Sequence, residues 1–368
     1  KPPGSLFAPS PIVPPKRADG QNARPELALA SFDIFCYAYI LIPNAQSIQL
    51  TGMTKTTYKV IVNPVSGRGN GERASVAVRR ALDIAEADYD LVETQGPGHA
   101  IELAQRAVLD GWDVIAAVGG DGTAHEVVQG LARAAQARGA WQTAQPVGAL
   151  GLIPIGTGND YAWRLDLPHN DPEQACRILL QGQRRTVDLG LVTDETGRSE
   201  FFHNHLGAGF EAATLIESLK LRRLRGFLLY LAAVLRVIPR NSRGWDMTIR
   251  CNGTTLSRPL LLASVANGGR TGGGFMMAPQ ARLDDGQLDL VCGHTPNVAV
   301  TFWLLPHVIR GTHLSKTQYV SAARAPDLVL EAPGGVPVHL DGEVFRTDAR
   351  RLEIRVLPKW LNVIAATP

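Results

Sequence analysis

A glycine-rich turn, GGDGT at residues 119–123, carries one aspartate, Asp121, where an apolar run stops and a helical pattern begins. Glycine permits backbone conformations that other residues avoid and lets a phosphate approach the main chain, and a helix start adds free N–H groups and a positive dipole end. Because like charges repel, Asp121 should act on a phosphate through Mg²⁺, water or a hydrogen-bonded neighbour. The alternative is a strand-to-helix turn in which Asp121 only caps the helix.

Two further glycine-rich loops carry similar groups. The loop NPVSGRGNG at 63–71 offers an amide, a hydroxyl and a guanidinium, and PIGTGND at 154–160 offers a hydroxyl and a carboxylate. The first loop is not a Walker loop, because that spacing and its Lys-Ser/Thr ending are absent. Three such loops predict one nucleotide-phosphate site. The residues expected to form it are Asn63, Ser66, Gly67, Arg68, Gly119, Gly120, Asp121, Gly122, Thr123, Thr157, Asn159 and Asp160.

A pair of carboxylates lies near the C-terminus, in HLDGEVF at 339–345. Asp341 and Glu343 are two residues apart, so an extended segment would place them on the same side, and Gly342 would allow close approach. Phosphoryl transfer to a hydroxyl needs a carboxylate near the attacking oxygen and cations near the developing phosphate charge. The alternative is a hairpin turn, a common use of Asp-Gly. The three loops upstream make catalysis the preferred interpretation.

Alternating strand and helix patterns must position these groups. Strand-like runs at 58–64, 112–120 and 146–155 alternate with helical spacing, which indicates a parallel sheet covered by helices, with ligands at the carboxyl ends of its strands. Later runs alternate like strands of an antiparallel sandwich. We therefore expect an α/β fold with a parallel nucleotide-binding domain over 55–185. A β-sandwich-like domain over 186–368 follows, whose C-terminal strand could return to the first domain.

Composition narrows the class of protein. The chain has 368 residues, 45% hydrophobic content and a formal charge of +3, which suits a globular protein of two domains. Its four cysteines form no CxxC pair, so neither a disulfide framework nor a thiolate zinc site is indicated, and a reducing cytoplasm fits best. The basic excess is too small and dispersed to predict nucleic acid as a partner.

The first 54 residues differ from the rest. Residues 1–24 are rich in proline and polar residues, which favours disorder. The apolar run within 27–43 is interrupted by Asp33 and is shorter than the ~20 residues that a membrane span needs. Because Met53 directly precedes the first strand pattern, we expect the functional chain to begin near it. Residues 1–54 would then be a disordered or peripheral extension.

The motifs NPVSG, GGDGT and PIGTGND, in this order and near these separations, resemble the catalytic domain of the diacylglycerol kinase and sphingosine kinase family. The bacterial soluble lipid kinases, with their NAD kinase-like fold, are the most similar, and the resemblance runs from about residue 59 to the C-terminus. It implies a nucleotide-binding domain and a β-rich domain with ATP between them. It also implies that Asp341 is the general base, that Glu343 organises metal and water, and that Asp121 joins a polar network with Mg²⁺.

The resemblance implies a structural Mg²⁺ as well, in the segment ARLDDGQLDL. Its ligands would be the Asp285 side chain and backbone carbonyls around Arg282 and Gln287, and oxygen donors suit that cation. A metal-free hairpin is the alternative.

The histidines are expected to have structural roles. His125 does not belong to an HExxH motif, and His203 and His205 alternate along an expected strand, so we assign none of them to a metal. The segment LGAGFEA at 206–212 could pass close to a ligand but fits strand-to-helix packing equally well, and it stays outside the catalytic set.

The expected function is ATP-dependent transfer of a phosphoryl group to a lipid hydroxyl, with diacylglycerol as the preferred acceptor and ATP and Mg²⁺ as cofactors. The expected partner is a lipid at the membrane surface, and a homodimer is included among the expected partners. A sphingoid base or another lipid is an alternative acceptor. An NAD kinase is disfavoured by NPVSG and the long β-rich half. A nucleotide-dependent lipid-binding protein is disfavoured by Asp121 and the paired carboxylates.

A helical tract covers residues 214–240. Its first half contains the basic residues Lys220, Arg222, Arg223 and Arg225, and many apolar residues follow them. It could lie at a membrane surface or beside the lipid entrance, in keeping with a cytoplasmic enzyme that binds membranes peripherally. The preferred interpretation is a core helix with a solvated basic end rather than a strong anchor.

Overall fold

The computed structural model describes residues 55–139, 147–221, 226–240, 243–295 and 297–366. The predictions for 1–54, including a chain start near Met53, lie outside the described residues, as do the three arginines of the basic segment at 222–225. The described chain from Thr56 onward belongs to one compact unit.

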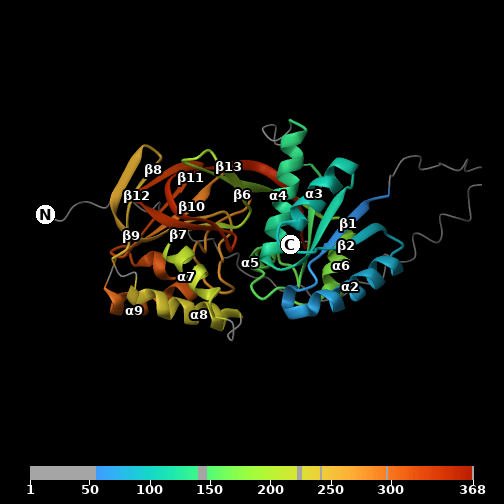
Figure 1. The fold of residues 1–368 in the computed structure, drawn as a ribbon, viewed down its shortest axis with the longest axis horizontal. Coiled ribbons are helices and arrows are strands. Elements are labelled where there is room, and N and C mark those ends of the chain that lie inside the picture. Colours follow the sequence, from blue (N-terminus) through green and yellow to red (C-terminus); the bar gives the residue numbers. More distant parts are fainter. Residues whose placement is uncertain (1–54, 140–146, 222–225, 241–242, 296, 367–368) are drawn as a thin grey trace, which may run out of the picture. The chain divides into compact units, whose positions relative to one another are not determined.

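The first half is a parallel sheet with helices on both faces (Figure 1). Strands β3 and β4 are buried along their whole length, as the apolar sequences VIAAVG and ALGLIP require for the centre of a parallel sheet. Helices α3 and α4 pack on one face, and α2 and α6 pack on the other. The elements are β1 (Thr57–Val62), α2 (Ser66–Ile84), β2 (Asp88–Glu93), α3 (His99–Asp110), β3 (Val114–Gly119), α4 (Asp121–Ala137), β4 (Ala149–Pro154), α5 (Asp160–Arg164) and α6 (Pro172–Gln181).

The second half is mainly antiparallel, which confirms the predicted order of a parallel α/β part followed by a β-rich part. Its strands are β5 (Arg184–Asp194), β6 (Ser199–Phe202), β7 (His205–Gly209), β8 (Trp245–Cys251), β9 (Thr254–Ala266), β10 (Leu288–His294), β11 (Val320–Ala325), β12 (Asp327–Leu340) and β13 (Glu343–Ile364). Its helices are α7 (Phe210–Ser218), α8 (Gly226–Val237), η1 (Ile238–Arg240), α9 (Val298–Ile309) and η2 (His313–Ser315).

The long strand β13 connects the two halves. It pairs antiparallel with β12 and β5, and near its end Val363 pairs with Leu150 of β4 in parallel register. The sheet therefore continues from β11 through β13 into β4, β3, β1 and β2. The β12–β13 hairpin and the loops after β1, β3 and β4 consequently belong to one framework.

The helical tract after β7 divides into α7 and α8. Val234 and Val237 of α8 are buried in a cluster with Phe210 and Phe275, while Leu228 and Leu235 are exposed. Among the residues that the structure describes, no helix is long and apolar enough to cross a membrane.

Candidate active site

The three glycine-rich loops touch one another through their backbones. A Cβ atom on Gly156 would lie 2.4 Å from the Cα atom of Gly120, and one on Gly67 would lie 2.2 Å from the carbonyl oxygen of Ile155. Gly67 also has a φ of +57°, a conformation that suits glycine. Glycine at these positions is therefore what allows the loops after β1, β3 and β4 to meet.

Polar bonds join the same loops. The amide of Asn63 donates to the Thr123 hydroxyl at 3.1 Å, and the Ile155 N–H donates to the Gly119 carbonyl at 2.9 Å. Asn159 donates to the Gly156 carbonyl at 2.9 Å. The structure thus brings together the predicted residues Asn63, Ser66, Gly67, Gly119, Gly120, Asp121, Gly122, Thr123, Asn159 and Asp160. Thr157 is exposed, and the Arg68 side chain lies outside the described part.

Two of these residues form a carboxylate pair around Gly158. A Cβ atom on this glycine would lie 2.8 Å from Asp121 Oδ2 and 3.5 Å from Asp160 Oδ2. Loss of hydration raises the pKa of Asp121, and burial with the nearby Asp121 charge raises the pKa of Asp160 to about 7. Two carboxylates so close oppose each other's ionisation, and a divalent cation would relieve that repulsion. The pair therefore fits Mg²⁺.

A segment of the second half packs against this pair. Asp160 accepts the Gly273 N–H at 2.8 Å, and Arg270 Nε lies 3.0 Å from its other oxygen. The Arg270 guanidinium also lies over the Trp163 ring, 5.3 Å from its centre. Arg270 is a functional candidate that sequence reasoning missed, because nothing in its local pattern points to a carboxylate of another loop.

Asp341 lies at the tip of the β12–β13 hairpin. Asp341 and Gly342 both have positive φ angles, +51° and +93°, as a type I′ hairpin turn requires. The side chain is nevertheless inside the molecule, with 7% of the residue exposed. Its Oδ1 accepts the N–H groups of Asn204 at 3.0 Å and His205 at 2.8 Å. Asp341 thus forms the hairpin turn with its backbone while its side chain is buried, so the turn does not exclude a catalytic role.

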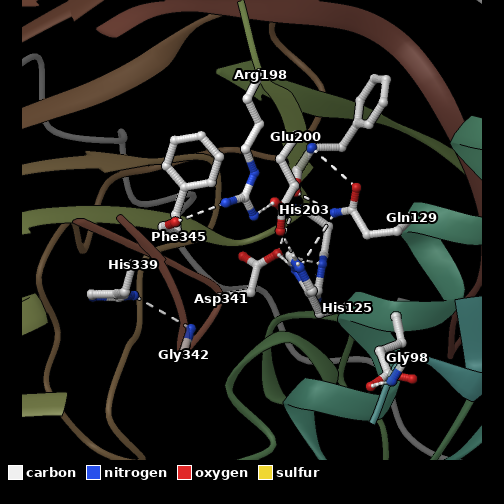
Figure 2. A network of polar contacts seen from close by, with 12 residues as sticks. Gly98, His125, Gln129, Arg198, Glu200, His203, His339, Asp341, Gly342 and Phe345 are labelled. Atoms are coloured by element: carbon white, nitrogen blue, oxygen red, sulfur yellow. Dashed lines mark hydrogen bonds and ion pairs between the residues drawn. The ribbon is translucent and has the colours of Figure 1, made fainter. Parts of the chain in front are cut away.

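Two histidines surround the other oxygen of Asp341 (Figure 2). His125 Nδ1 lies 2.9 Å from Oδ2, His203 Nδ1 lies 2.8 Å away, and the His203 N–H donates to it at 3.1 Å. Although burial opposes the shift, His203 and His125 hold the pKa of Asp341 well below its usual range. Asp341 is therefore an ionised carboxylate in a nearly dry site.

His125 carries the matching positive charge. Its Nε2 atom lies 3.2 Å from Glu200 Oε1, and Arg198 holds the other oxygen of Glu200 at 2.8 Å (Figure 2). Burial lowers the pKa of His125, but the bonds to Asp341 and Glu200 outweigh it and raise the pKa to about 10. Sequence reasoning missed His125 and Glu200. The sequence does contain one indication for His125. It follows Asp121 by four residues, so the two side chains lie on the same face of α4.

Glu343 begins β13 and is exposed. Its carboxylate lies beside the start of α4, because a Cβ atom on Gly122 would be 2.8 Å from Glu343 Oε1. Asp341 and Glu343 therefore both approach α4, at His125 and at Gly122.

The residues predicted for a structural Mg²⁺ lie apart from these loops. The Asp285 carboxylate pairs with Arg324 and accepts the Gln287 N–H at 3.1 Å, while Arg282 pairs with Asp284 at 3.5 Å. Because the Arg324 guanidinium already pairs with Asp285, Mg²⁺ would have to displace it there. The magnesium site at Asp285 stays a prediction.

Within the described part of the chain, two clusters of histidines and carboxylates have donor atoms within 4.8 Å of one another, as a metal ion needs. One is the set of His125, His203 and Asp341 described above. In this set the cationic His125 already balances the charge of Asp341, and Arg198 pairs with the neighbouring Glu200. The other contains Glu211, which together with His205 lies between the hairpin and an apolar cavity.

This cavity has an empty volume of about 840 Å³, including open solvent at its mouth. Apolar side chains of α8, β9 and α9 form most of its wall, among them Val234, Leu261 and Leu304. Glu211 also lines it, and Glu211 Oε2 lies 3.1 Å from His205 Nε2. Since the His205 N–H binds Asp341, one residue connects the cavity to the buried carboxylate.

Known proteins share this architecture. Two family models match, the diacylglycerol kinase catalytic domain over residues 57–192 and the YegS C-terminal NAD kinase beta sandwich-like domain over residues 204–365. A diacylglycerol kinase of Mycobacterium tuberculosis is 31% identical over 307 residues, which are 83% of this chain and 93% of the relative. A Stenotrophomonas maltophilia protein named "Probable lipid kinase YegS-like" is 29% identical over 309 residues, 83% of this chain and 95% of the relative.

A crystal structure of a diacylglycerol kinase from Bacillus anthracis has a TM-score of 0.63 at 19% identity, and the match covers 86% of this chain and 98% of that one. At this identity the similarity shows the fold alone. Together these matches confirm the predicted resemblance and the β-sandwich-like second half.

Proposed function

Because this chain belongs to the diacylglycerol kinase family of lipid kinases, we propose that it transfers the γ-phosphoryl group of ATP to a lipid hydroxyl. Diacylglycerol, the acceptor in the relatives' names, is the first acceptor to test, and its product would be phosphatidic acid. The observation that carries the proposal is the position of Asp341, which lies close to the phosphate loops and is connected through His205 to an apolar cavity.

The three loops would hold the ATP phosphates. Glycine at 67, 120 and 156 lets the three loops meet at one place, and the N-terminus of α4 adds N–H groups and a dipole that attract a polyanion. Asp121 and Asp160 would hold Mg²⁺, which neutralises charge on the transferred phosphate when it is bound. Arg270 would keep Asp160 oriented toward the loops.

Asp341 would accept the hydrogen of the attacking hydroxyl. Its low pKa makes it a weak base, which suits phosphoryl transfer because the loose transition state needs little deprotonation of the nucleophile. The main task of Asp341 is then to orient the oxygen and to receive its proton late. The nearby His125 cation would keep Asp341 ionised. The Glu343 carboxylate would add a negative charge beside the first turn of α4.

The lipid would enter from a membrane surface over α8 and α9. Both helices line the apolar cavity, and both also expose large apolar side chains, including Leu228 at 64% and Trp303 at 49% exposure. Lys316 lies over the Trp303 ring at 5.4 Å and adds a cation to this surface. Exposed aromatic and basic groups favour the interface of an anionic bilayer.

The test of this proposal is magnesium-dependent transfer of labelled γ-phosphate to lipids in vesicles, with NAD as a soluble competitor. We expect label in a lipid product. Label on NAD, or no transfer to any lipid, would contradict the proposal.

A further inference from the structure

The apolar cavity has a carboxylate in its wall. Glu211, in the first turn of α7, is 5% exposed, and neither of its side-chain oxygens has a hydrogen-bond partner among the described residues. Two other polar groups of the wall have partners, since Thr214 donates to the Phe210 carbonyl at 2.7 Å and His294 contacts Ser321 at 2.7 Å, whereas His313 Nδ1 has none among the described residues. Glu211 is the one carboxylate among the described residues that line the cavity, and it is therefore the strongest acceptor that the cavity offers to a ligand.

Two buried histidines position this carboxylate. His205 Nε2, whose hydrogen-bond partner is the Ser264 hydroxyl at 2.5 Å, lies 3.1 Å from Glu211 Oε2, and His339 Nε2 lies 3.8 Å from the same oxygen. The Gly342 N–H donates to His339 Nδ1 at 3.4 Å, and a ring whose Nδ1 accepts this bond carries its hydrogen on Nε2, the atom nearer to Glu211. Both histidines approach the same oxygen, and Glu211 Oε1 is left for a ligand. This tautomer of His339 also disfavours a metal ion, which would need the Nε2 lone pair.

The site of Glu211 is directly coupled to that of Asp341. The N–H of His205 binds Asp341 while its ring contacts Glu211, and Gly342, which binds His339, follows Asp341 in the hairpin. His205 thus lies between the two carboxylates, and a lipid headgroup whose reacting hydroxyl is at Asp341 would extend its neighbouring atoms toward Glu211.

A diacylglycerol has one hydroxyl, which Asp341 would bind, and it would offer Glu211 only ester oxygens. Those oxygens accept hydrogen bonds, so the carboxylate would stay unpaired, which is costly in a dry cavity. We propose that Glu211 is a specificity-determining residue that binds a second hydrogen-bond donor of the acceptor lipid, next to the hydroxyl that is phosphorylated. This inference rests on the proposed kinase reaction but not on diacylglycerol as the acceptor.

Two kinds of lipid supply such a donor. A monoacylglycerol offers a second hydroxyl, and a sphingoid base offers an ammonium. The experiment compares kcat/KM for monoacylglycerol, sphingoid base and diacylglycerol of matched chain length in mixed micelles. It uses the full chain, Glu211→Gln and Glu211→Met. Glu102→Gln is the control, because Glu102 also stands in the first turn of a helix but is exposed.

We expect the parent chain to prefer one of the two-donor lipids over diacylglycerol. Glu211→Met should reduce that preference by about 10- to 100-fold, the effect of losing a hydrogen bond to a charged group. Glu211→Gln should keep most of the preference if the donor is a hydroxyl and lose it if the donor is an ammonium. Glu102→Gln should leave the preference unchanged.

Equal kcat/KM for all three lipids, or an unchanged preference in folded Glu211→Met, would overturn the role of Glu211 and leave the kinase reaction standing. No phosphorylation of any lipid by the parent chain would overturn both. If Glu211→Met does not fold, the lipid preference of the parent chain and that of Glu211→Gln test the role of Glu211. Stoichiometric Zn²⁺ binding that Glu211→Gln abolishes would replace the inference with a metal site.

Discussion

His125 Nδ1 lies 2.9 Å from Asp341 Oδ2, although 216 residues separate them in the sequence. The contact joins the first turns of α4, which follow the phosphate loop, to the tip of the β12–β13 hairpin. It places a cation beside the carboxylate that would receive the lipid hydroxyl. The geometry of the acceptor site and that of the phosphate site are therefore coupled through one buried ion pair.

Replacing His125 by glutamine should destabilise the protein and reduce lipid phosphorylation. The change leaves the buried Asp341 without the His125 cation and Glu200 with Arg198 alone, and breaking a buried pair from one side costs about 3–5 kcal/mol of unfolding free energy. Urea denaturation measures the loss. An unchanged midpoint would contradict the assigned charge of His125.

The same ion pair predicts how stability depends on pH. The pKa of His125 in the folded protein, about 10, is above its ordinary value of 6.5. Between these two pH values the folded state therefore binds a proton that the unfolded state lacks. The contribution of His125 to stability is complete below pH 6.5 and is lost as the pH rises toward 10. The slope should reach about −1.4 kcal/mol per pH unit and should disappear in His125→Gln. Equal slopes in both proteins would refute the assignment.

Adding one methyl group at Gly156 should impair the phosphate site. A Cβ atom there would lie 2.4 Å from the Gly120 Cα atom, so Gly156→Ala must push the two loops apart. We expect about 1–3 kcal/mol of destabilisation and about tenfold weaker ATP binding, measured by calorimetry. Gly96→Ala is the matched control, because its added atom meets nothing within 4 Å. If both variants bind ATP equally well, the loop contact does not form the site.

Binding of Mg²⁺ with ATP should strengthen between pH 6 and pH 8. Asp160, with its pKa raised to about 7, is largely protonated at the lower pH and must lose its proton before it can hold a cation. Calorimetry in two buffers of different ionisation enthalpy should detect the released proton. Asp160→Asn should bind Mg²⁺ more weakly and release no proton, and unchanged proton release in this variant would place the cation elsewhere.

Polar substitution on α8 and α9 should weaken membrane binding. Leu228→Gln combined with Trp303→Gln removes two exposed apolar groups and should lower partitioning to anionic vesicles about tenfold in a sedimentation assay. Val76→Gln with Ile84→Gln is the control, since both residues are exposed on α2. Equal loss in both pairs would argue against a specific surface.

The meeting of Gly120 and Gly156 could be predicted from the sequence, because both follow strand patterns in a βαβ alternation and parallel strands end at a common edge. The role of the segment Asp341–Glu343 was harder to predict, since its residues suit both a hairpin turn and a catalytic carboxylate. The structure contains the turn and buries Asp341 as well, so the two interpretations were not true alternatives.

The partners of these groups could not be predicted. His125 contacts Glu200 and Asp341 only because the register of β6 and β12 against α4 brings them together, and no local spacing encodes that register. Likewise, Gly273 and Asp160 meet across 113 residues through loops without periodicity. Glu211 lies in the segment 206–212, whose sequence fits proximity to a ligand and strand-to-helix packing equally well. Its burial in a cavity wall follows from the packing of α7 against α8 and β9, which no local pattern encodes.

The most direct test of the account is the transfer of labelled γ-phosphate from Mg·ATP to lipid by the parent chain, Asp341→Asn and the exposed control Asp327→Asn. We predict label in lipid for the parent and the control, and a rate about 10²- to 10⁴-fold lower for folded Asp341→Asn with ATP binding retained. Equal rates for the parent and Asp341→Asn would contradict the central role of the hairpin carboxylate.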